Sequence, residues 1–202
     1  MKKFIYLISP TNIKGNKFYT KLDLVLKTNK VKFFQLRLKK ITIKNFIKIS
    51  KKIKKIARKN KVKFLINDKP LIAKKIDADG CHIGQKDMSY KKSRKLLGKN
   101  KIIGITCHNS KKLALKAKKY GANYVAFGSF FRTSTKKTAF KANLAILRWA
   151  KKKINMPIVA IGGINSSNYE KILSNGADFV ACSSYVWHNK KLDPVSAIKK
   201  FK

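Results

Sequence analysis

Acidic residues are scarce in this chain of 202 residues. Asp and Glu total 8, whereas Lys and Arg total 50, so the formal net charge is +42 at pH 7. Such a balance excludes an acidic calcium buffer and any site that needs many carboxylates. It also raises the question of which anionic partners the protein binds.

Cysteine and long apolar segments are rare as well. The three cysteines, Cys81, Cys107 and Cys182, form no Cys-x-x-Cys pair, which favours a reducing compartment. Each lies in or beside an apolar run, so we expect all three to be buried. No run of 18 or more apolar residues occurs, and the amino-terminal segment turns polar too quickly for a signal peptide. We therefore expect a cytoplasmic protein with no membrane span.

The positive charge comes almost entirely from lysine. Only five of the 50 basic residues are arginine, and the 45 lysines are spread along the whole chain. Runs such as residues 51–55 and 151–153 fall on segments with helical spacing, where lysine covers the solvent-facing side. No nucleic-acid-binding motif accompanies them, so we interpret the excess as compositional bias with weak, non-specific polyanion binding. A basic nucleic-acid-binding barrel remains an alternative.

Hydrophobic residues make up 44% of the chain, which excludes a wholly disordered protein. They form short apolar runs, typical of buried strands, and these runs alternate with longer segments of helical spacing. Helices are expected over residues 43–57, 113–120, 144–149 and 169–174, and from Asp193-Pro194 onward. The eight predicted strands are residues 4–9, 33–39, 63–67, 80–83, 101–106, 124–128, 157–161 and 179–182.

Eight strands alternating with helices predict parallel pairing through helical crossovers. A doubly wound open sheet is possible, but no Gly-x-Gly-x-x-Gly motif follows the first strand. We therefore predict the α/β class, as a compact (βα)8 TIM barrel that forms a single catalytic domain over residues 1–202.

Polar residues follow the predicted strands, where the active site of such a barrel lies. Asp68 and Asp87 come after neighbouring strands, and two converging carboxylates favour Mg²⁺. Arg37, Lys39, Asn67 and Lys136 lie at the same end and suit phosphate oxygens. The alternative roles are a helix N-cap for Asp68 and a turn residue for Asp87. Gly162-Gly163 and Ser183-Ser184, after strands seven and eight, suit a second phosphate held by backbone N–H groups.

Six segments along this predicted barrel form a specific combination. They are residues 35–39 (QLRLK), 64–68 (FLIND), 78–87 (ADGCHIGQKD), 103–108 (IGITCH), 128–136 (GSFFRTSTK) and 160–164 (AIGGI). In this order they resemble the thiamine-phosphate synthase (thiamine-phosphate pyrophosphorylase) family over nearly the full chain. The resemblance implies a magnesium-dependent transferase that joins 4-amino-2-methyl-5-pyrimidinylmethyl diphosphate to thiazole phosphate, releasing diphosphate.

The resemblance also implies roles for individual residues. Arg37, Lys39 and Lys136 would be catalytic, because cations offset the charge on the leaving diphosphate. Asp68 and Asp87 would hold magnesium. Thr106 stands where the family usually has serine. The residues expected to contact the pyrimidine diphosphate are Gln35, Arg37, Lys39, Asn67 and Lys136, and those expected around the thiazole phosphate are Thr133, Ser134, Thr135, Gly163, Ser183 and Ser184. Leu36, Leu38 and Thr106 are further residues expected to bind substrate.

The chain departs from the family pattern at Leu38, where glutamate is common, and at Arg132, where proline is usual. His82 has no evident catalytic partner, so we expect a hydrogen-bonded residue lining the barrel. A thiazole tautomerase-like paralogue would share the barrel without the coupling reaction. The retained carboxylate pair argues against that alternative.

Overall fold

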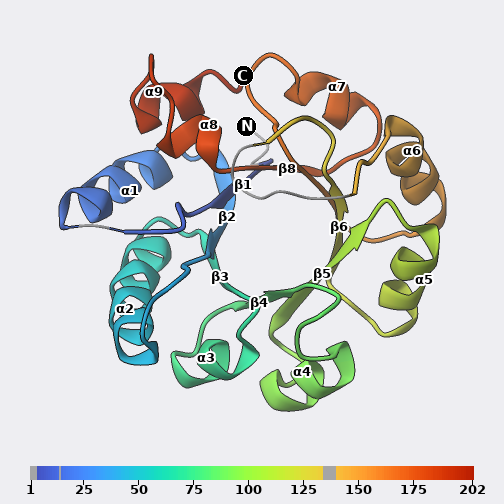
Figure 1. Ribbon diagram of the computed structural model, residues 1–202, viewed down its shortest axis with the longest axis horizontal. Helices are drawn as coiled ribbons and strands as arrows, with labels where there is room; N and C mark the ends of the chain where they lie inside the picture. The colour runs from blue at the N-terminus through green and yellow to red at the C-terminus, as the bar shows by residue number, and fades with distance from the viewer. Residues whose placement is uncertain (1–3, 14, 134–139) are drawn as a thin grey trace.

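The computed structural model describes residues 4–13, 15–133 and 140–202, and in it eight parallel strands close into the predicted barrel (Figure 1). The strands follow one another in chain order, and β8 pairs with β1 to close the ring. They are β1 (Ile5–Ile8), β2 (Val31–Leu36), β3 (Lys63–Asn67), β4 (Gly80–Ile83), β5 (Ile102–His108), β6 (Tyr124–Gly128), β7 (Ile158–Ile161) and β8 (Phe179–Cys182).

The helices form an outer ring around these strands (Figure 1). Their order along the chain gives the repeated strand–helix alternation that a right-handed crossover between parallel strands requires. They are α1 (Lys17–Lys27), α2 (Ile43–Lys59), α3 (Pro70–Lys75), α4 (Tyr90–Leu97), α5 (Lys111–Lys119), α6 (Leu144–Lys153), α7 (Tyr169–Ser174), α8 (Ser184–Trp187) and α9 (Pro194–Lys199).

The predicted helical patterns are confirmed, and α2 shows why they form. Thr42 caps the helix by accepting a hydrogen bond from the backbone N–H of Asn45 at 3.3 Å. Phe46 and Ile53 are buried against the barrel, while Lys51 and Lys55 are exposed on the opposite side. Burying such a side chain stabilises the fold by about 1.5–3 kcal/mol, so the apolar stripe rather than the lysines holds this helix in place.

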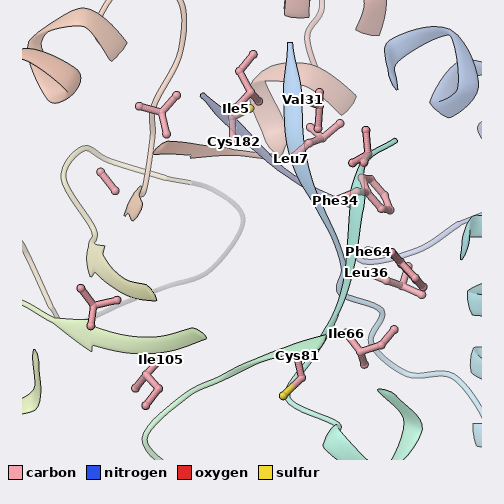
Figure 2. Packing of buried hydrophobic residues seen from close by; sticks show 14 of the residues in the cluster. Ile5, Leu7, Val31, Phe34, Leu36, Phe64, Ile66, Cys81, Ile105 and Cys182 are labelled. Atoms are coloured by element: carbon pink, nitrogen blue, oxygen red, sulfur yellow. The ribbon is translucent and has the colours of Figure 1, made fainter. Parts of the chain in front are cut away.

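Two apolar layers make up the core, because alternate strand residues point outward and inward. Ile5 and Leu7 of β1 point into the layer between barrel and helices, together with Phe34 of β2 (Figure 2). Tyr6 and Ile8 point into the barrel, where they pack with inward-facing residues of the other strands. That inner layer further contains Leu65, Tyr124, Ala126, Val159 and Ala181.

The cysteines are free and buried, as expected. Burial raises the pKa of Cys81, Cys107 and Cys182 to about 12, so these thiols stay protonated at neutral pH. Within the described ranges of the chain, no helix has the length and apolar character needed to cross a membrane.

Candidate active site

A cavity of about 170 Å³ opens at the carboxyl ends of the strands, as the fold predicts. Six of the predicted site residues line it: Arg37, Thr106, Thr133, Gly163, Ser183 and Ser184. Ser134, Thr135 and Lys136 lie outside the described residues. The cavity is further lined by residues outside that predicted set, namely Ile8, His108, Gly128, Ser129, Ile161, Gly162, Ile164, Ala181 and Cys182.

The end of β2 supplies the first polar group. Gln35 is buried and donates from Nε2 to Oδ1 of Asn67 at 2.9 Å, which fixes the amide of Asn67 on the neighbouring strand. The backbone N–H of Arg37 donates to Oγ of the buried Ser9 at 2.9 Å. Ser9 in turn donates to the carbonyl of Pro10. The loop after β1 therefore anchors the backbone from which the Arg37 guanidinium extends.

Leu36 and Leu38 were predicted to bind substrate, but their side chains do not line the cavity. Both are buried in the outer apolar layer, because they alternate with Gln35, Arg37 and Lys39. Lys39 is exposed and borders a separate hollow with the loop after β1. The alternation thus separates two packing residues from the three polar ones.

The two predicted magnesium ligands face each other on adjacent loops. The pKa of Asp68 is raised to about 6, first because its surroundings remove water from the carboxylate. Hydrogen bonding to Asp87 and repulsion from its charge raise the pKa further, whereas Asn67 and Arg37 lower it. The pair lies beside the main cavity rather than in its lining, and Arg37 belongs to both places.

Of the alternative roles considered for these two acids, the structure supports the turn role of Asp87 but not the helix-cap role of Asp68. Asp68 is not a helix cap: Lys69 occupies the N-cap position of α3, and no side chain caps that helix. Asp68 instead adopts a left-handed backbone conformation, with φ at 61°, and its N–H donates to the carbonyl of His82 at 2.8 Å. Asp87 does serve its turn, because its Oδ2 accepts the N–H of Gly84 at 2.7 Å.

His82 lies inside the barrel in a chain of hydrogen bonds, as expected. Its Nδ1 lies 2.8 Å from the hydroxyl of Tyr124, and its Nε2 lies 2.8 Å from Oγ1 of Thr106. The hydroxyl of Tyr124 is also 2.8 Å from that of Tyr6. The chain therefore connects the buried centre of the barrel to a residue of the cavity wall.

The opposite wall is built from the loops after β7 and β8. Gly162 and Gly163 have φ values of 107° and 64°, a region that other residues rarely adopt. A Cβ atom on Gly163 would lie 2.4 Å from the carbonyl oxygen of Arg132. Ser183 donates from Oγ to the carbonyl of Ser9 at 3.2 Å, and α8 begins at Ser184. This wall brings backbone and hydroxyl groups to one place without an acidic side chain among its described residues.

Comparison with known proteins gives this geometry a family. A family model described as thiamine monophosphate synthase matches residues 5–186. The chain belongs to this family. It is 59% identical over 201 residues to the thiamine-phosphate synthase of Pelagibacter ubique (strain HTCC1062), covering 100% of this chain and 97% of that protein. It is 36% identical over 197 residues to the enzyme of Rhodospirillum centenum (strain ATCC 51521 / SW), covering 98% and 95%.

Solved structures agree with this family membership. The thiamine phosphate pyrophosphorylase of Pyrococcus furiosus superposes with a TM-score of 0.86 at 28% identity, covering 98% of this chain and 93% of that one. The tryptophan synthase α-subunit of the same organism, at 12% identity and a TM-score of 0.72, shows only that the barrel fold is shared. The family membership makes this chain a transferase of thiamine biosynthesis.

For a thiamine monophosphate synthase, the described geometry offers two chemically different ends of one site. One end carries Asn67, Asp68 and Asp87 beside the guanidinium of Arg37. The other end carries Gly163, Ser183 and Ser184. His108 adds an aromatic face to the wall: it is the last residue of β5 and stacks on Phe140 with ring centroids 3.9 Å apart. The predicted strand ended at residue 106, so the sequence placed His108 outside it.

Proposed function

We propose that this chain joins 4-amino-2-methyl-5-pyrimidinylmethyl diphosphate to thiazole phosphate, giving thiamine phosphate and diphosphate. The observation that carries the proposal is the position of Arg37, which lines the main cavity and also acts on the acidic pair through its charge. Arg37 therefore links the two carboxylates to the cavity whose opposite wall carries the glycines and serines, so both groups can act on ligands in the same site. Two anionic substrates need two separate sets of phosphate-binding groups, one at each end of the site.

The residues at the acidic end fit a magnesium ion. Asp68 and Asp87 lie within hydrogen-bonding reach of each other, and this contact raises the pKa of Asp68. Asn67 lowers the pKa of Asp68 through a side-chain hydrogen bond, and the two carboxylates supply oxygen atoms of the kind that Mg²⁺ prefers. The described residues hold no cluster of three or more His, Cys, Asp or Glu side chains. Two carboxylates suffice for magnesium, which completes its shell with water and substrate phosphates.

The reaction needs positioning and charge stabilisation rather than a protein nucleophile. The bond between the pyrimidinyl methylene and the diphosphate oxygen breaks, and both electrons leave with diphosphate. The lone pair of the thiazole nitrogen then forms the new carbon–nitrogen bond, with no proton gained or lost. When bound, Mg²⁺ supplies Lewis-acid stabilisation of the departing diphosphate.

The chain's own residues do the rest. Arg37 adds positive charge beside the diphosphate, and Lys39 and Lys136 are proposed for the same work. Asn67, held by Gln35, orients the pyrimidine end. Gly163, Ser183 and Ser184 hold the thiazole phosphate, so that its ring nitrogen stays close to the reacting carbon. The apolar part of the wall, which includes Ile8 and Ile161, keeps water from trapping the cation.

The test is direct formation of product. The purified protein is incubated with both substrates and Mg²⁺, and thiamine phosphate and diphosphate are measured in equal amounts. A reaction that consumes thiazole phosphate alone and only isomerises it would indicate a tautomerase and refute the proposal. The matched variant is Arg37→Gln, which keeps a polar side chain but loses the charge; we expect a fall in kcat/KM of about 100-fold or more.

A further inference from the structure

The direction of the hydrogen-bonded chain inside the barrel follows from the partners and burial of its first member, Tyr6. It runs from Tyr6 through Tyr124 and His82 to Thr106, with 2.8 Å at each of its three links. Each link holds one proton, so the question is which partner donates it. The answer decides what Thr106 offers to a ligand.

Tyr6 fixes the first link. Its side chain is 2% exposed, and burial raises the pKa of both Tyr6 and Tyr124 above the ordinary value, so both phenols keep their protons. Among the described residues, the Tyr6 hydroxyl has one hydrogen-bond partner, the hydroxyl of Tyr124. A buried O–H group without an acceptor is costly, so Tyr6 donates to Tyr124.

The remaining links follow in order. Because the Tyr124 oxygen accepts from Tyr6, its own proton goes to its other neighbour, Nδ1 of His82. A neutral imidazole whose Nδ1 accepts carries its proton on Nε2. Nε2–H therefore donates to Oγ1 of Thr106, and the Thr106 proton is left over. Thr106 lines the cavity, and within the described chain its hydroxyl has no second hydrogen bond.

We propose that Tyr6, Tyr124 and His82 are positioning residues that hold the hydroxyl of Thr106 as a hydrogen-bond donor toward the cavity. The ligand atom that Thr106 meets must then be an acceptor, such as an unprotonated oxygen of a phosphate or diphosphate. This last step rests on the proposed function, whereas the direction of the chain does not.

The tautomer of His82 tests the direction without any substrate. The protein has three histidines, so ¹⁵N-labelled protein gives few imidazole signals, and His82→Gln assigns those of His82. The two ring nitrogens differ widely in ¹⁵N chemical shift when one is protonated and the other is not. We expect an unprotonated Nδ1 and a protonated Nε2. A proton on Nδ1, either alone or in addition to Nε2, would overturn the proposal in the wild-type protein itself.

Two tyrosine variants separate positioning from simple packing. Tyr124→Phe removes the donor to Nδ1 of His82, so the imidazole proton is free to move from Nε2 to Nδ1. The hydroxyl of Thr106 can then donate its proton to Nε2 instead of to a ligand. We expect the ¹⁵N signals of His82 to change and kcat/KM for the coupling reaction to fall roughly tenfold, the factor for one neutral hydrogen bond. Tyr6→Phe leaves Tyr124 donating to Nδ1, so the His82 signals should keep the wild-type pattern.

Tyr90→Phe is the matched control, because it also removes a buried tyrosine hydroxyl, one that donates to the carbonyl of Gly121 at 2.7 Å on the helical side of β5. It should leave both the His82 signals and kcat/KM unchanged. Wild-type signals and wild-type kcat/KM in Tyr124→Phe would overturn the proposal. If wild-type protein carries the expected tautomer but makes no thiamine phosphate, the proposed function fails while the direction of the chain stands.

Discussion

Replacing Asp87 by asparagine or by alanine separates the two tasks of this residue. Its Oδ2 accepts the N–H of Gly84 and so holds the loop, while the carboxylate as a whole repels that of Asp68. Asparagine keeps an oxygen for Gly84 and places an amide N–H₂ group beside Asp68, so a repulsion becomes a hydrogen bond. Alanine removes both interactions.

The metal-free variants are expected to differ in stability. A hydrogen bond to a charged acceptor contributes about 1.5–3 kcal/mol, and we take about 1–2 kcal/mol here because Asp87 is partly exposed. In a protein of this size, 1 kcal/mol shifts Tm by about 2–4 °C. Both variants lose the repulsion, so the missing Gly84 bond should make Asp87→Ala melt about 2–8 °C below Asp87→Asn. Asp87→Asn should melt at or above the wild-type temperature at pH 8, because the pKa of Asp68 is no longer raised by a charged neighbour.

Catalysis should respond in the same direction in both variants. Losing an indirect partner of a metal costs 10–100-fold, so losing a direct ligand is expected to lower magnesium-dependent diphosphate release by about 100-fold or more. The assays are thermal unfolding in the presence of a chelator and diphosphate release titrated with Mg²⁺. A wild-type magnesium response in Asp87→Asn would refute the assignment of Asp87 as a ligand. An Asp87→Asn variant that melts well below the wild-type protein would refute the repulsion.

Three further outcomes follow from the structure. In Gly104→Ala, the new Cβ would lie 1.8 Å from the ring of Tyr124, so urea unfolding should show a loss of at least about 1–3 kcal/mol. Gly163→Ala, strained by its positive φ, should raise KM for thiazole phosphate about tenfold and leave KM for the pyrimidine diphosphate nearly unchanged, as steady-state kinetics would show. Lys101 holds the pKa of Asp77 at about 2, so Asp77 stabilises the fold above pH 3.8 and this contribution disappears as the pH falls toward 2. The Tm difference between wild type and Asp77→Asn should be small, since the residue is exposed, and should vanish below pH 2; a difference that grows with acid would contradict the sign.

Strand positions were predictable where apolar runs end sharply. The segments 63–67, 80–83, 124–128 and 179–182 are strands with the predicted bounds, because Gly, Asp or Asn residues border them. The second strand was placed at 33–39, whereas β2 is Val31–Leu36. The predicted strand was too long at its carboxyl end because of Leu38. This residue continues the apolar alternation beyond the strand, since the following loop still packs on the outer layer.

Site residues were predictable at the ends of strands but not across the barrel. Arg37, Thr106 and Ser183 follow from the rule that chemistry lies at the carboxyl ends. The bond between Tyr6 and Tyr124 joins residues 118 positions apart and depends on the diameter and register of the closed barrel. No local pattern carries that information, so the sequence identified His82 as hydrogen-bonded without naming its partners.

The few acids of this basic protein show why the acidic pair suits a divalent cation. Six of the eight are engaged elsewhere, four of them in ion pairs with lysine, one as the cap of α9 and one as the acceptor of a tyrosine hydroxyl. Asp68 and Asp87 form no ion pair with a lysine of the described residues, and they face each other instead. A lysine between them would satisfy both charges and repel a divalent ion. With 45 lysines in the chain, the lack of a lysine between these two acids is what the proposed magnesium site requires, and the two carboxylates together raise the pKa of Asp68. The six engaged acids are Asp23, Asp77, Asp79, Asp178, Asp193 and Glu170.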